Sequence, residues 1–436
     1  MARLLRTDLV DAAVLEVHAL VRQEGWLADR ALDRVLRRER RLYANERRAV
    51  AETVYGMLRA QGQLLWLAGA KGDQGDPATV YALWLARTGA VQPEAAARRL
   101  GVPVGVVARA LDRADARIAA LPDPVERLAV EGSLPRWIAE AFTAELGLAE
   151  ARALAAAMNE RAPLTVRANL LATTREALQA RLAGEGVVAR PTPFSPWGLV
   201  LDGHANAFGL ASFQEGLFEI QDEGSQLIAL AVGARAGQKV ADACAGAGGK
   251  ALALAAEMHG KGSLLELDSD ADRLEESKRR ARRAHVHNLR ARAIPAGPEA
   301  GAALADLEGQ CERVLVDAPC SGLGTLRRKP DARWRLVPGD PARFSALQKE
   351  LVLRFAKLVK PGGRLVYATC AIGRAENAEV AEHLVREAPG FEPLPLAAAL
   401  GEPLARSLGA DGATLQLLPH RHGTDGFFLA AFQRAR

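Results

Sequence analysis

The sequence predicts a multidomain protein with an all-α N-terminal domain (residues 1–125), a small α+β subdomain (126–225) and a C-terminal α/β domain (226–436). Three observations support this organisation. The length of 436 residues is about three times the roughly 150 residues of a typical domain. Apolar residues of the first part recur at helical spacing, and beyond residue 225 strand-like runs alternate with helical patterns.

The composition is that of a globular protein. Hydrophobic residues make up 49% and charged residues 25%, which excludes wholesale disorder and a collagen-like chain. The net charge of +5 permits an anionic partner without requiring one. Asp8 and Asp11 interrupt the apolar stretch that a signal peptide needs, and no segment approaches the roughly 18 apolar residues of a membrane span. We therefore expect a soluble, cytoplasmic protein without a membrane partner.

The N-terminal domain is predicted to consist of several helices. Val10, Val14 and Val17 share one helical face. A basic run lies in the same domain and comprises Arg37, Arg38, Arg40, Arg41, Arg47 and Arg48. These side chains either contact phosphates or form a solvated face together with the interspersed Glu39 and Glu46.

The turn-forming segment LPDP leads into a helical linker and places a boundary near residue 125, and strand signals begin only at residue 163. PLTVRANL indicates a strand and TTREALQARLAGEG a helix, so we expect a ferredoxin- or RRM-like subdomain here. Further along, helical patterns separate the apolar runs KVADAC, SLLELD, RVLVDAP and GRLVYATC. This alternation predicts a mostly parallel sheet with helices on both faces.

A glycine-rich turn follows the first of these predicted strands. Its residues are Cys244, Ala245, Gly246, Ala247, Gly248, Gly249 and Lys250. Such a turn lets backbone N–H groups approach a ligand closely. Its spacing is not G-x-G-x-x-G, and Ala251 stands where a P-loop has Ser or Thr, so nicotinamide and ATP sites are disfavoured.

Asp268 closes the next predicted strand, at a position where an acidic side chain can accept the hydroxyl protons of a ribose. A helix N-cap is the alternative, for which Asp268, Ser269 or Asp270 would serve equally. A cationic helix follows, and its basic residues form either a solvated surface or an RNA contact. They are Lys278, Arg279, Arg280, Arg282 and Arg283.

The four cysteines lack the spacing of a zinc site, and we expect no metal. Cys311 and Cys244 are interpreted as small buried apolar residues. Cys320 and Cys370 each follow the carboxyl end of a predicted strand, so both can face one pocket. Two reduced thiols at that place suit covalent catalysis, because a thiolate is a strong nucleophile.

Together these motifs resemble the RsmB/Sun-type family of RNA cytosine-C5 methyltransferases, which use S-adenosylmethionine. The family's cofactor turn, Cys-Ala-Ala-Pro-Gly-Gly-Lys, is similar to residues 244–250, and its ribose-binding Asp matches Asp268. Its Asp-Ala-Pro-Cys-Ser-Gly matches residues 317–322, and its Thr-Cys matches Thr369 and Cys370. The resemblance implies a Rossmann-like methyltransferase domain. ERRAVAETVYGMLR is similar to the NusB-like RNA-binding domain of the RsmB branch.

The resemblance also implies different catalytic roles for the two thiols. Cys370 would add to C6 of cytosine, Cys320 would help to remove the C5 proton, and Asp317 would hydrogen-bond the base or the cofactor. Spacing alone does not assign the attacking thiol, since DNA cytosine methyltransferases attack with the Cys of their Pro-Cys motif.

A thiol reaches C6 only when the base is unstacked, so the expected partner is single-stranded or flipped-out RNA rather than DNA. Five basic residues beside the Cys320 motif are predicted to bind phosphates: Arg327, Arg328, Lys329, Arg333 and Arg335. Trp334 either stacks on a base or belongs to the core. We expect a monomer.

Three departures from the family pattern stand out. Gly246 and Ala247 replace Ala and Pro, and Ala371 replaces Ser. Residues 294–301 contain no Asp where the family has an acidic residue near the adenine, and Glu299 is the candidate replacement. The leading interpretation is methylation of small-subunit ribosomal RNA. Transfer RNA or large-subunit RNA as substrate is the first alternative, and a catalytically silent assembly factor is the second. Retention of both thiols disfavours a silent protein, and the missing G-x-G-x-x-G disfavours a dehydrogenase.

Overall fold

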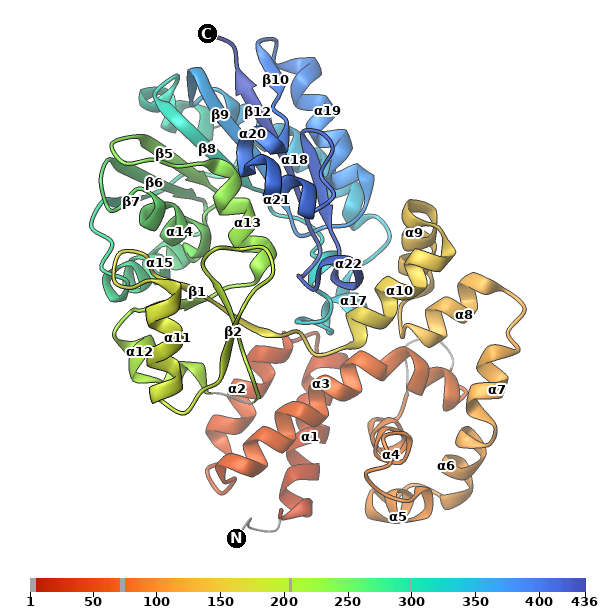
Figure 1. Cartoon of the computed structure of the whole chain (residues 1–436). Helices are drawn as coiled ribbons and strands as arrows, with labels where there is room; N and C mark the ends of the chain where they lie inside the picture. Colours follow the sequence, from red (N-terminus) through yellow and green to blue (C-terminus); the bar gives the residue numbers. More distant parts are fainter. Residues whose placement is uncertain (1–4, 71–74, 204–205, 298) are drawn as a thin grey trace. The chain divides into compact units, whose positions relative to one another are not determined.

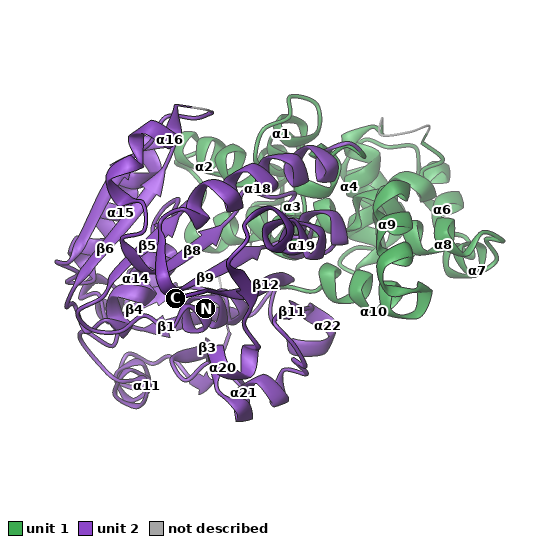
Figure 2. Ribbon diagram, turned by 90° about the horizontal axis from the view of Figure 1, so that it is seen from above, with its two compact units in different colours: residues 1–161, 325–338 green, residues 162–324, 339–436 purple. Residues whose placement is uncertain are grey.

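The computed structural model describes residues 5–70, 75–203, 206–297 and 299–436. The chain forms two compact units (Figure 2). Unit 1 contains Met1–Arg161 together with Thr325–Pro338, and unit 2 contains Ala162–Gly324 together with Gly339–Arg436. This grouping differs from the three consecutive segments predicted from the sequence, because a short stretch of the C-terminal half packs with the N-terminal helices.

Unit 1 is helical, and no strand occurs among its described residues. Its core comes from helical-spacing valines such as Val14, Val17, Val50 and Val54, which are fully buried. The helices are α1 (Thr7–Arg22), α2 (Ala28–Arg38), α3 (Ala44–Leu67), α4 (Pro77–Arg87), α5 (Pro93–Arg99), α6 (Val104–Leu111), α7 (Ala114–Ala119), α8 (Pro124–Glu131), α9 (Arg136–Leu146), α10 (Leu148–Asn159) and α17 (Ala332–Arg335).

Unit 2 begins with a four-stranded antiparallel sheet in the order β2-β3-β1-β4. Val166 of the central strand β1 pairs with Leu199 of β3 and with Ile220 of β4. The buried Leu178 and Leu182 of α11 pack in the same apolar cluster. The elements are β1 (Leu164–Ala168), α11 (Arg175–Gly184), β2 (Ala189–Pro191), β3 (Gly198–Leu201), α12 (Ala211–Gln214) and β4 (Phe218–Ile220).

The larger sheet has the order β10-β12-β9-β8-β5-β6-β7, with β11 paired to β12 (Figure 1). Strands β5 to β9 are parallel, whereas β10, β11 and β12 pair antiparallel. The strands are β5 (Lys239–Ala243), β6 (Ser263–Asp268), β7 (Leu289–Ala293), β8 (Cys311–Asp317), β9 (Val359–Thr369), β10 (Phe391–Pro393), β11 (Thr414–Leu417) and β12 (Phe427–Arg434). The chain order reverses between β5 and β8, and open α/β sheets bind ligands at such a switch point.

Helices cover both faces of this sheet, as the alternation predicts. Leu315 and Val366 face a cluster with α13 and α14, whereas Val314 and Val316 face a cluster with α18 and α19. The helices are α13 (Glu223–Val232), α14 (Gly249–Glu257), α15 (Ala271–Arg283), α16 (Ala300–Ala303), α18 (Asp340–Ala356), α19 (Ala378–Glu387), α20 (Leu396–Leu400), α21 (Glu402–Ser407) and α22 (Pro419–His422). The C-terminal part is thus a Rossmann-like domain with a mixed sheet.

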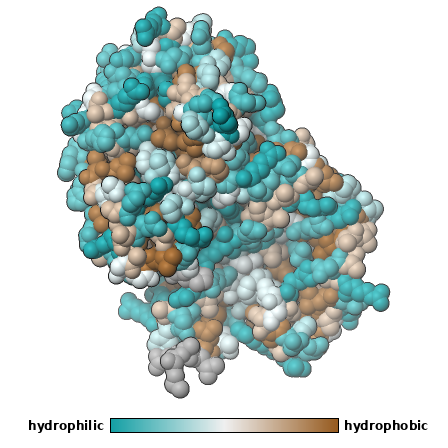
Figure 3. Space-filling view, in the orientation of Figure 1, coloured by the Kyte–Doolittle hydropathy of each residue, from teal (hydrophilic) through white to brown (hydrophobic). Residues whose placement is uncertain are grey.

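Hydrophobic residues on the face drawn in Figure 3 occur in separate patches among hydrophilic ones. The largest exposed fractions among apolar side chains belong to Phe208 and Val188, at 64% and 63%. Within the part of the chain that the structure describes, no helix has both the length and the apolar character needed to cross a bilayer.

Candidate active site

The turn after β5 lies at the switch point of the sheet and is held from two sides. Ala245 donates its backbone N–H to Leu267 O at 3.1 Å, and Arg280 Nη1 donates to Ala247 O at 2.7 Å. At Gly248, with φ +78°, an added Cβ would lie 2.0 Å from Ser277 Oγ, so only glycine fits. Arg280 of the predicted cationic helix therefore supports the turn where the family has proline.

Asp268 ends β6 and its carboxylate faces the same turn. Its Oδ2 accepts the backbone N–H of Gly246 at 2.7 Å, and its Oδ1 accepts that of Asp270 at 2.8 Å. The helix N-cap is Asp270, whose Oδ1 accepts the backbone N–H of Arg273 at 3.1 Å. Of the two roles open to Asp268, the structure gives the capping role to its neighbour and leaves Asp268 at the edge of the sheet.

Buried charges line the space between β5 and β8. Lys250 Nζ lies 2.7 Å from Asp317 Oδ2. Burial acts to lower the pKa of Lys250, but the charge and hydrogen bond of Asp317 together with the charge of Asp242 raise it overall. Asp242 is 1% exposed, and neither of its carboxylate oxygens has a hydrogen-bond partner among the described residues. Burial, followed by the charges of Asp317 and Glu266, raises the pKa of Asp242 well above its ordinary value. An orphaned carboxylate of this kind favours a cationic ligand.

The two predicted catalytic thiols meet at the ends of β8 and β9. Cys320 Sγ lies 3.2 Å from Cys370 Sγ, and the backbone N–H of Cys370 points to Cys320 Sγ at 3.3 Å. The hydrogen bond with Cys370, and then burial, raise the pKa of Cys320. The other two thiols are apart from this pair: Cys311 is fully buried in the core, and Cys244 is half-buried in the cofactor-type turn.

Sequence reasoning missed Glu376, a buried carboxylate that holds the Cys320 loop. Glu376 Oε1 accepts the backbone N–H of Ser321 at 2.8 Å, and its Oε2 accepts Ser321 Oγ–H at 2.6 Å. Gln348 Nε2 bridges to Pro319 O at 2.9 Å and to Glu376 at 3.2 Å. The residues on both sides of Cys320 are thereby fixed. An acidic residue six positions after Cys370 is the only signal in the sequence, and its partners are distant in the chain.

The next residue, Asn377, fixes the other thiol loop. Its Oδ1 accepts the hydroxyl of Thr369 at 2.6 Å, and its Nδ2 donates to Ala371 O at 3.2 Å. These two contacts flank Cys370. Consecutive residues thus position the two cysteines, Glu376 through the first loop and Asn377 through the second.

The basic cluster after Cys320 belongs to unit 1, and its members differ sharply in exposure. Arg333 is fully buried and donates to Ser133 O at 3.0 Å and to Asn159 Oδ1 at 2.8 Å. Burial lowers the pKa of Arg333 to about 9, so the side chain stays charged at neutral pH. Arg327 is 5% exposed. The prediction that Arg333 and Arg327 bind phosphates is therefore corrected, since the interior of the protein encloses both side chains.

The remaining members of that cluster reach the surface. Lys329 and Arg335 are exposed and Arg328 is half-buried. Arg335 also forms an ion pair with Asp331 at 3.0 Å. Glu299, the acidic residue nearest to the place where the family has one, is exposed just before α16. Among the described residues, no group of His, Cys, Asp and Glu could hold a metal ion.

A glycine turn and a carboxylate at the next strand end, both at the switch point of the sheet, define a nucleotide-cofactor site of the Rossmann type. Comparison with known proteins specifies the class. The family described as 16S rRNA methyltransferase RsmB/F matches residues 229–433, and a ferredoxin-like domain of RsmF/B-like methyltransferases matches residues 134–207. The chain belongs to the RsmB/F family of rRNA methyltransferases, and its cofactor is S-adenosylmethionine.

Two relatives and one solved structure illustrate the similarity. A probable ribosomal RNA small subunit methyltransferase B of Bacillus subtilis is 37% identical over 316 residues, covering 72% of this chain and 69% of the relative. A protein of the same description from Synechocystis is 30% identical, covering 93% of this chain and 95% of the relative. The crystal structure of PH0851 covers 99% of this chain and 100% of its own, with 26% identity and a TM-score of 0.78.

The site fits the cofactor on its own evidence. S-adenosylmethionine carries a sulfonium and an ammonium group, and the orphaned carboxylate of Asp242 suits a positive charge. The space beside Gly246 is open, since an added Cβ would meet only Arg273 Nη1 at 3.9 Å, and Asp268 has further acceptor capacity for ribose hydroxyls.

Proposed function

We propose that this protein methylates C5 of a cytosine in small-subunit ribosomal RNA through a covalent Cys–C6 intermediate. One observation carries the proposal: the sulfurs of Cys320 and Cys370 lie 3.2 Å apart at the carboxyl edge of a methyltransferase sheet. RNA binding alone needs neither thiol. A methyltransferase whose target atom is already nucleophilic needs no cysteine pair either.

The residues that would hold the cofactor lie in the turn Cys244–Lys250 and at Asp268. S-adenosylmethionine, when bound, supplies an electrophilic methyl group. Asp242 would face a positive charge in the cofactor, and Asp317, held by Lys250, would hydrogen-bond the base or the cofactor.

Cytosine C5 is a poor nucleophile until a thiolate adds at C6. The family resemblance assigns the attack to Cys370, which loses its proton to solvent and adds as a thiolate. The new C6–S bond makes C5 enamine-like and able to take a methyl group. Cys320 then acts from its thiolate form, its own proton having passed to solvent, and its raised pKa makes that thiolate a strong base for the C5 proton. The C5–H electron pair re-forms the C5–C6 double bond, the C6–S bond breaks, and Cys370 leaves as a thiolate.

The helices of unit 1 have, we propose, a NusB-like fold that supplies RNA affinity. Arg328, Lys329 and Arg335 remain as phosphate contacts near an unstacked base, because their side chains reach the surface. The protein is proposed to act as a cytoplasmic monomer on RNA, not DNA.

Methyl transfer from radiolabelled S-adenosylmethionine to deproteinised small-subunit rRNA that lacks the modification tests the proposal. Bisulfite sequencing then locates the product, and one protected cytosine is the expected result. Incorporation of label only into transfer RNA or large-subunit RNA would overturn the assignment of small-subunit RNA as the substrate. No incorporation into any of the three, with cofactor binding intact, would make a silent assembly factor the better interpretation.

A further inference from the structure

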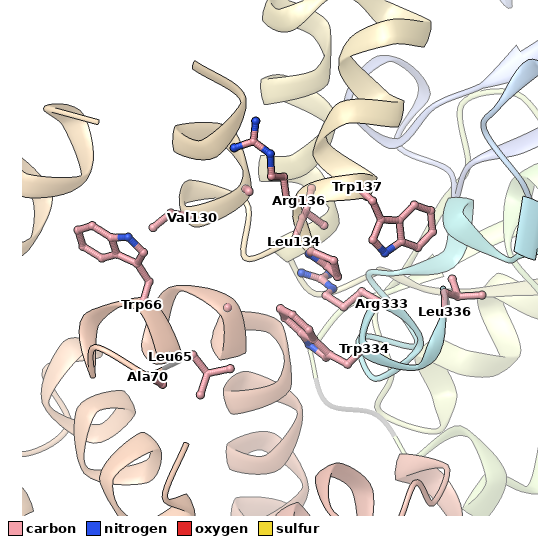
Figure 4. A pocket seen from close by; sticks show the side chains of 13 residues that line it. Leu65, Trp66, Ala70, Val130, Leu134, Arg136, Trp137, Arg333, Trp334 and Leu336 are labelled. Carbon is pink, nitrogen blue, oxygen red and sulfur yellow. The ribbon is translucent and has the colours of Figure 1, made fainter. Parts of the chain in front are cut away.

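Unit 1 contains a pocket of about 440 Å³ that the methyl-transfer chemistry does not use. Three tryptophans line it: Trp66 from α3, Trp137 from α9 and Trp334 from α17 (Figure 4). Figure 4 shows these side chains coming from three separate elements around Leu134. The chain has six tryptophans in 436 residues, so half of them meet at one cavity.

The three rings are half-buried and line an open cavity, whereas a purely structural tryptophan is enclosed by its neighbours. Trp334 forms the fixed wall: its Nε1–H donates to Leu58 O at 3.2 Å, and a Cβ added to Gly62 would lie 2.8 Å from its ring. Among the described residues, the ring nitrogens of Trp66 and Trp137 donate no comparable hydrogen bond.

Guanidinium groups lie beside two of the three tryptophan rings. The guanidinium of Arg117 lies 5.5 Å from the ring centre of Trp66, and that of Arg22 lies 5.2 Å from the ring centre of Trp334. Arg136 stands exposed at the rim, where Asp123 and Glu140 share its charge, and no Asp or Glu is among the lining residues. Aromatic faces beside guanidinium groups are the combination that binds single-stranded nucleic acid.

We propose that this pocket receives an unstacked nucleobase of single-stranded RNA, with the flanking phosphates near the arginines. The volume falls in the range of about 300–1,000 Å³ found for ligand pockets. Stacking between a base and an aromatic ring tolerates any sequence, because every base has a π-face. The site rests on the proposed function, because it gives the RNA affinity of unit 1 a location and a base-binding mode.

Trp334 and Leu336 belong to the stretch that directly continues the Cys320 loop. The same segment of chain therefore bears a catalytic thiol at one end and a wall of the pocket at the other. A base held in the pocket would anchor the strand whose target cytosine is methylated elsewhere on the protein.

Binding of a labelled oligo(A) to the full-length protein, followed by fluorescence anisotropy, tests the proposal. Trp66→Ala and Trp137→Ala should each weaken binding about tenfold, since stacking on one ring contributes that much to affinity. Trp26→Ala is the matched control: it is a half-buried tryptophan of unit 1 with Arg34 over its ring at 5.1 Å, but outside the pocket. Its affinity should stay within twofold.

A second measurement changes the RNA and compares the unaltered protein with the two pocket variants. An oligomer with abasic sites in place of bases should bind the unaltered protein about tenfold more weakly, and the two pocket variants should then bind it no worse than the unaltered protein does. Equal affinity of base-containing and abasic oligomers would overturn the proposal. So would unchanged RNA affinity in folded variants that have lost binding to an assembled small subunit, because the occupant would then be a protein. If the unaltered protein transfers no methyl group but these differences in RNA binding remain, the proposed activity is wrong and the assignment of the pocket still holds.

Discussion

The strand-end site of unit 2 and the tryptophan pocket of unit 1 differ in charge and in the kind of side chain. The strand-end site contains buried carboxylates: Glu376 holds the Cys320 loop, and Asp242 and Glu266 lie on β5 and β6. Around the tryptophans lie guanidinium groups. By sequence, unit 1 has 28 Lys and Arg against 22 Asp and Glu, whereas unit 2 has 29 against 30. The chemical centre therefore offers little attraction to a polyanion, and RNA affinity is expected to come mainly from the helical unit.

The largest expected effect that distinguishes the two regions is a loss of methyl transfer without a loss of RNA affinity. Cys370→Ala should abolish methyl transfer, because no thiolate remains to activate C5. RNA affinity should stay within a few fold, since the change removes one small side chain far from any basic cluster in the sequence. Radiolabel incorporation and anisotropy measure the two quantities. Normal activity in this variant would contradict the nucleophile assignment.

Cys320→Ala should trap the protein on its substrate. Attack by Cys370 still occurs, but removal of the C5 proton is slowed, so a covalent protein–RNA adduct accumulates. A denaturing gel would show it as a slowly migrating band. The double variant Cys320→Ala/Cys370→Ala is the control and should give no band, whereas an adduct in the double variant would mean that another residue attacks.

Glu376→Gln should lower kcat by about 10- to 100-fold while leaving KM for RNA near its original value. The amide keeps one acceptor for Ser321 but loses the second, so the Cys320 loop shifts slightly, and misplacement by about 1 Å costs on that order. Steady-state kinetics separate the two constants. Ser321→Ala removes the same hydrogen bond from the other side, so the double variant should be no slower than the worse single one. If the losses in kcat of the two single variants added up in the double variant, Glu376 and Ser321 would not act through their mutual hydrogen bond.

The sequence could predict the elements whose signal is local. Helical spacing of Val14 and Val17, and the apolar strands ending at Asp268 and Asp317, depend on neighbours in the chain and match the structure. Capping was ambiguous, because Asp268 ends a strand two residues before the helix that Asp270 caps.

Contacts distant in sequence escaped prediction. Glu376 contacts Ser321, which is 55 residues away in the chain. The local sequence around a buried acidic residue does not distinguish it from an exposed one. Arg333 lies in a run of basic residues that has the composition of a phosphate site. Its partners, the carbonyl of Ser133 and the side chain of Asn159, are more than 170 residues away. Only tertiary packing reveals that this guanidinium serves the interior.

Arg333→Leu therefore tests stability rather than RNA binding. Removing the guanidinium leaves buried carbonyls without donors, which should destabilise unit 1 by about 2–3 kcal/mol. Urea unfolding followed by tryptophan fluorescence measures this, since five of the six tryptophans belong to unit 1. Lys329→Ala, at an exposed position of the same run, should leave stability unchanged but reduce the salt dependence of RNA binding by about one ion. The reverse pattern would restore Arg333 as a phosphate contact.

The smallest expected effect is a difference in how the units respond to pH. Burial raises the pKa of Glu257 to about 8 and that of Glu266 to about 7, so folded unit 2 holds protons that the unfolded chain releases near pH 4.5. Stability of unit 2 should therefore fall as pH rises from about 5 to 8. After division by the intrinsic base-catalysed rate, amide protection in β6 and α14 should fall over this range. Protection in α3 should rise instead, because burial lowers the pKa of His18, which is bonded to Gln61 of α3, and the unfolded chain then binds the proton that the folded one does not. Glu257→Gln mimics the protonated carboxyl and should flatten the profile of unit 2, and an unchanged slope would show that other groups cause it.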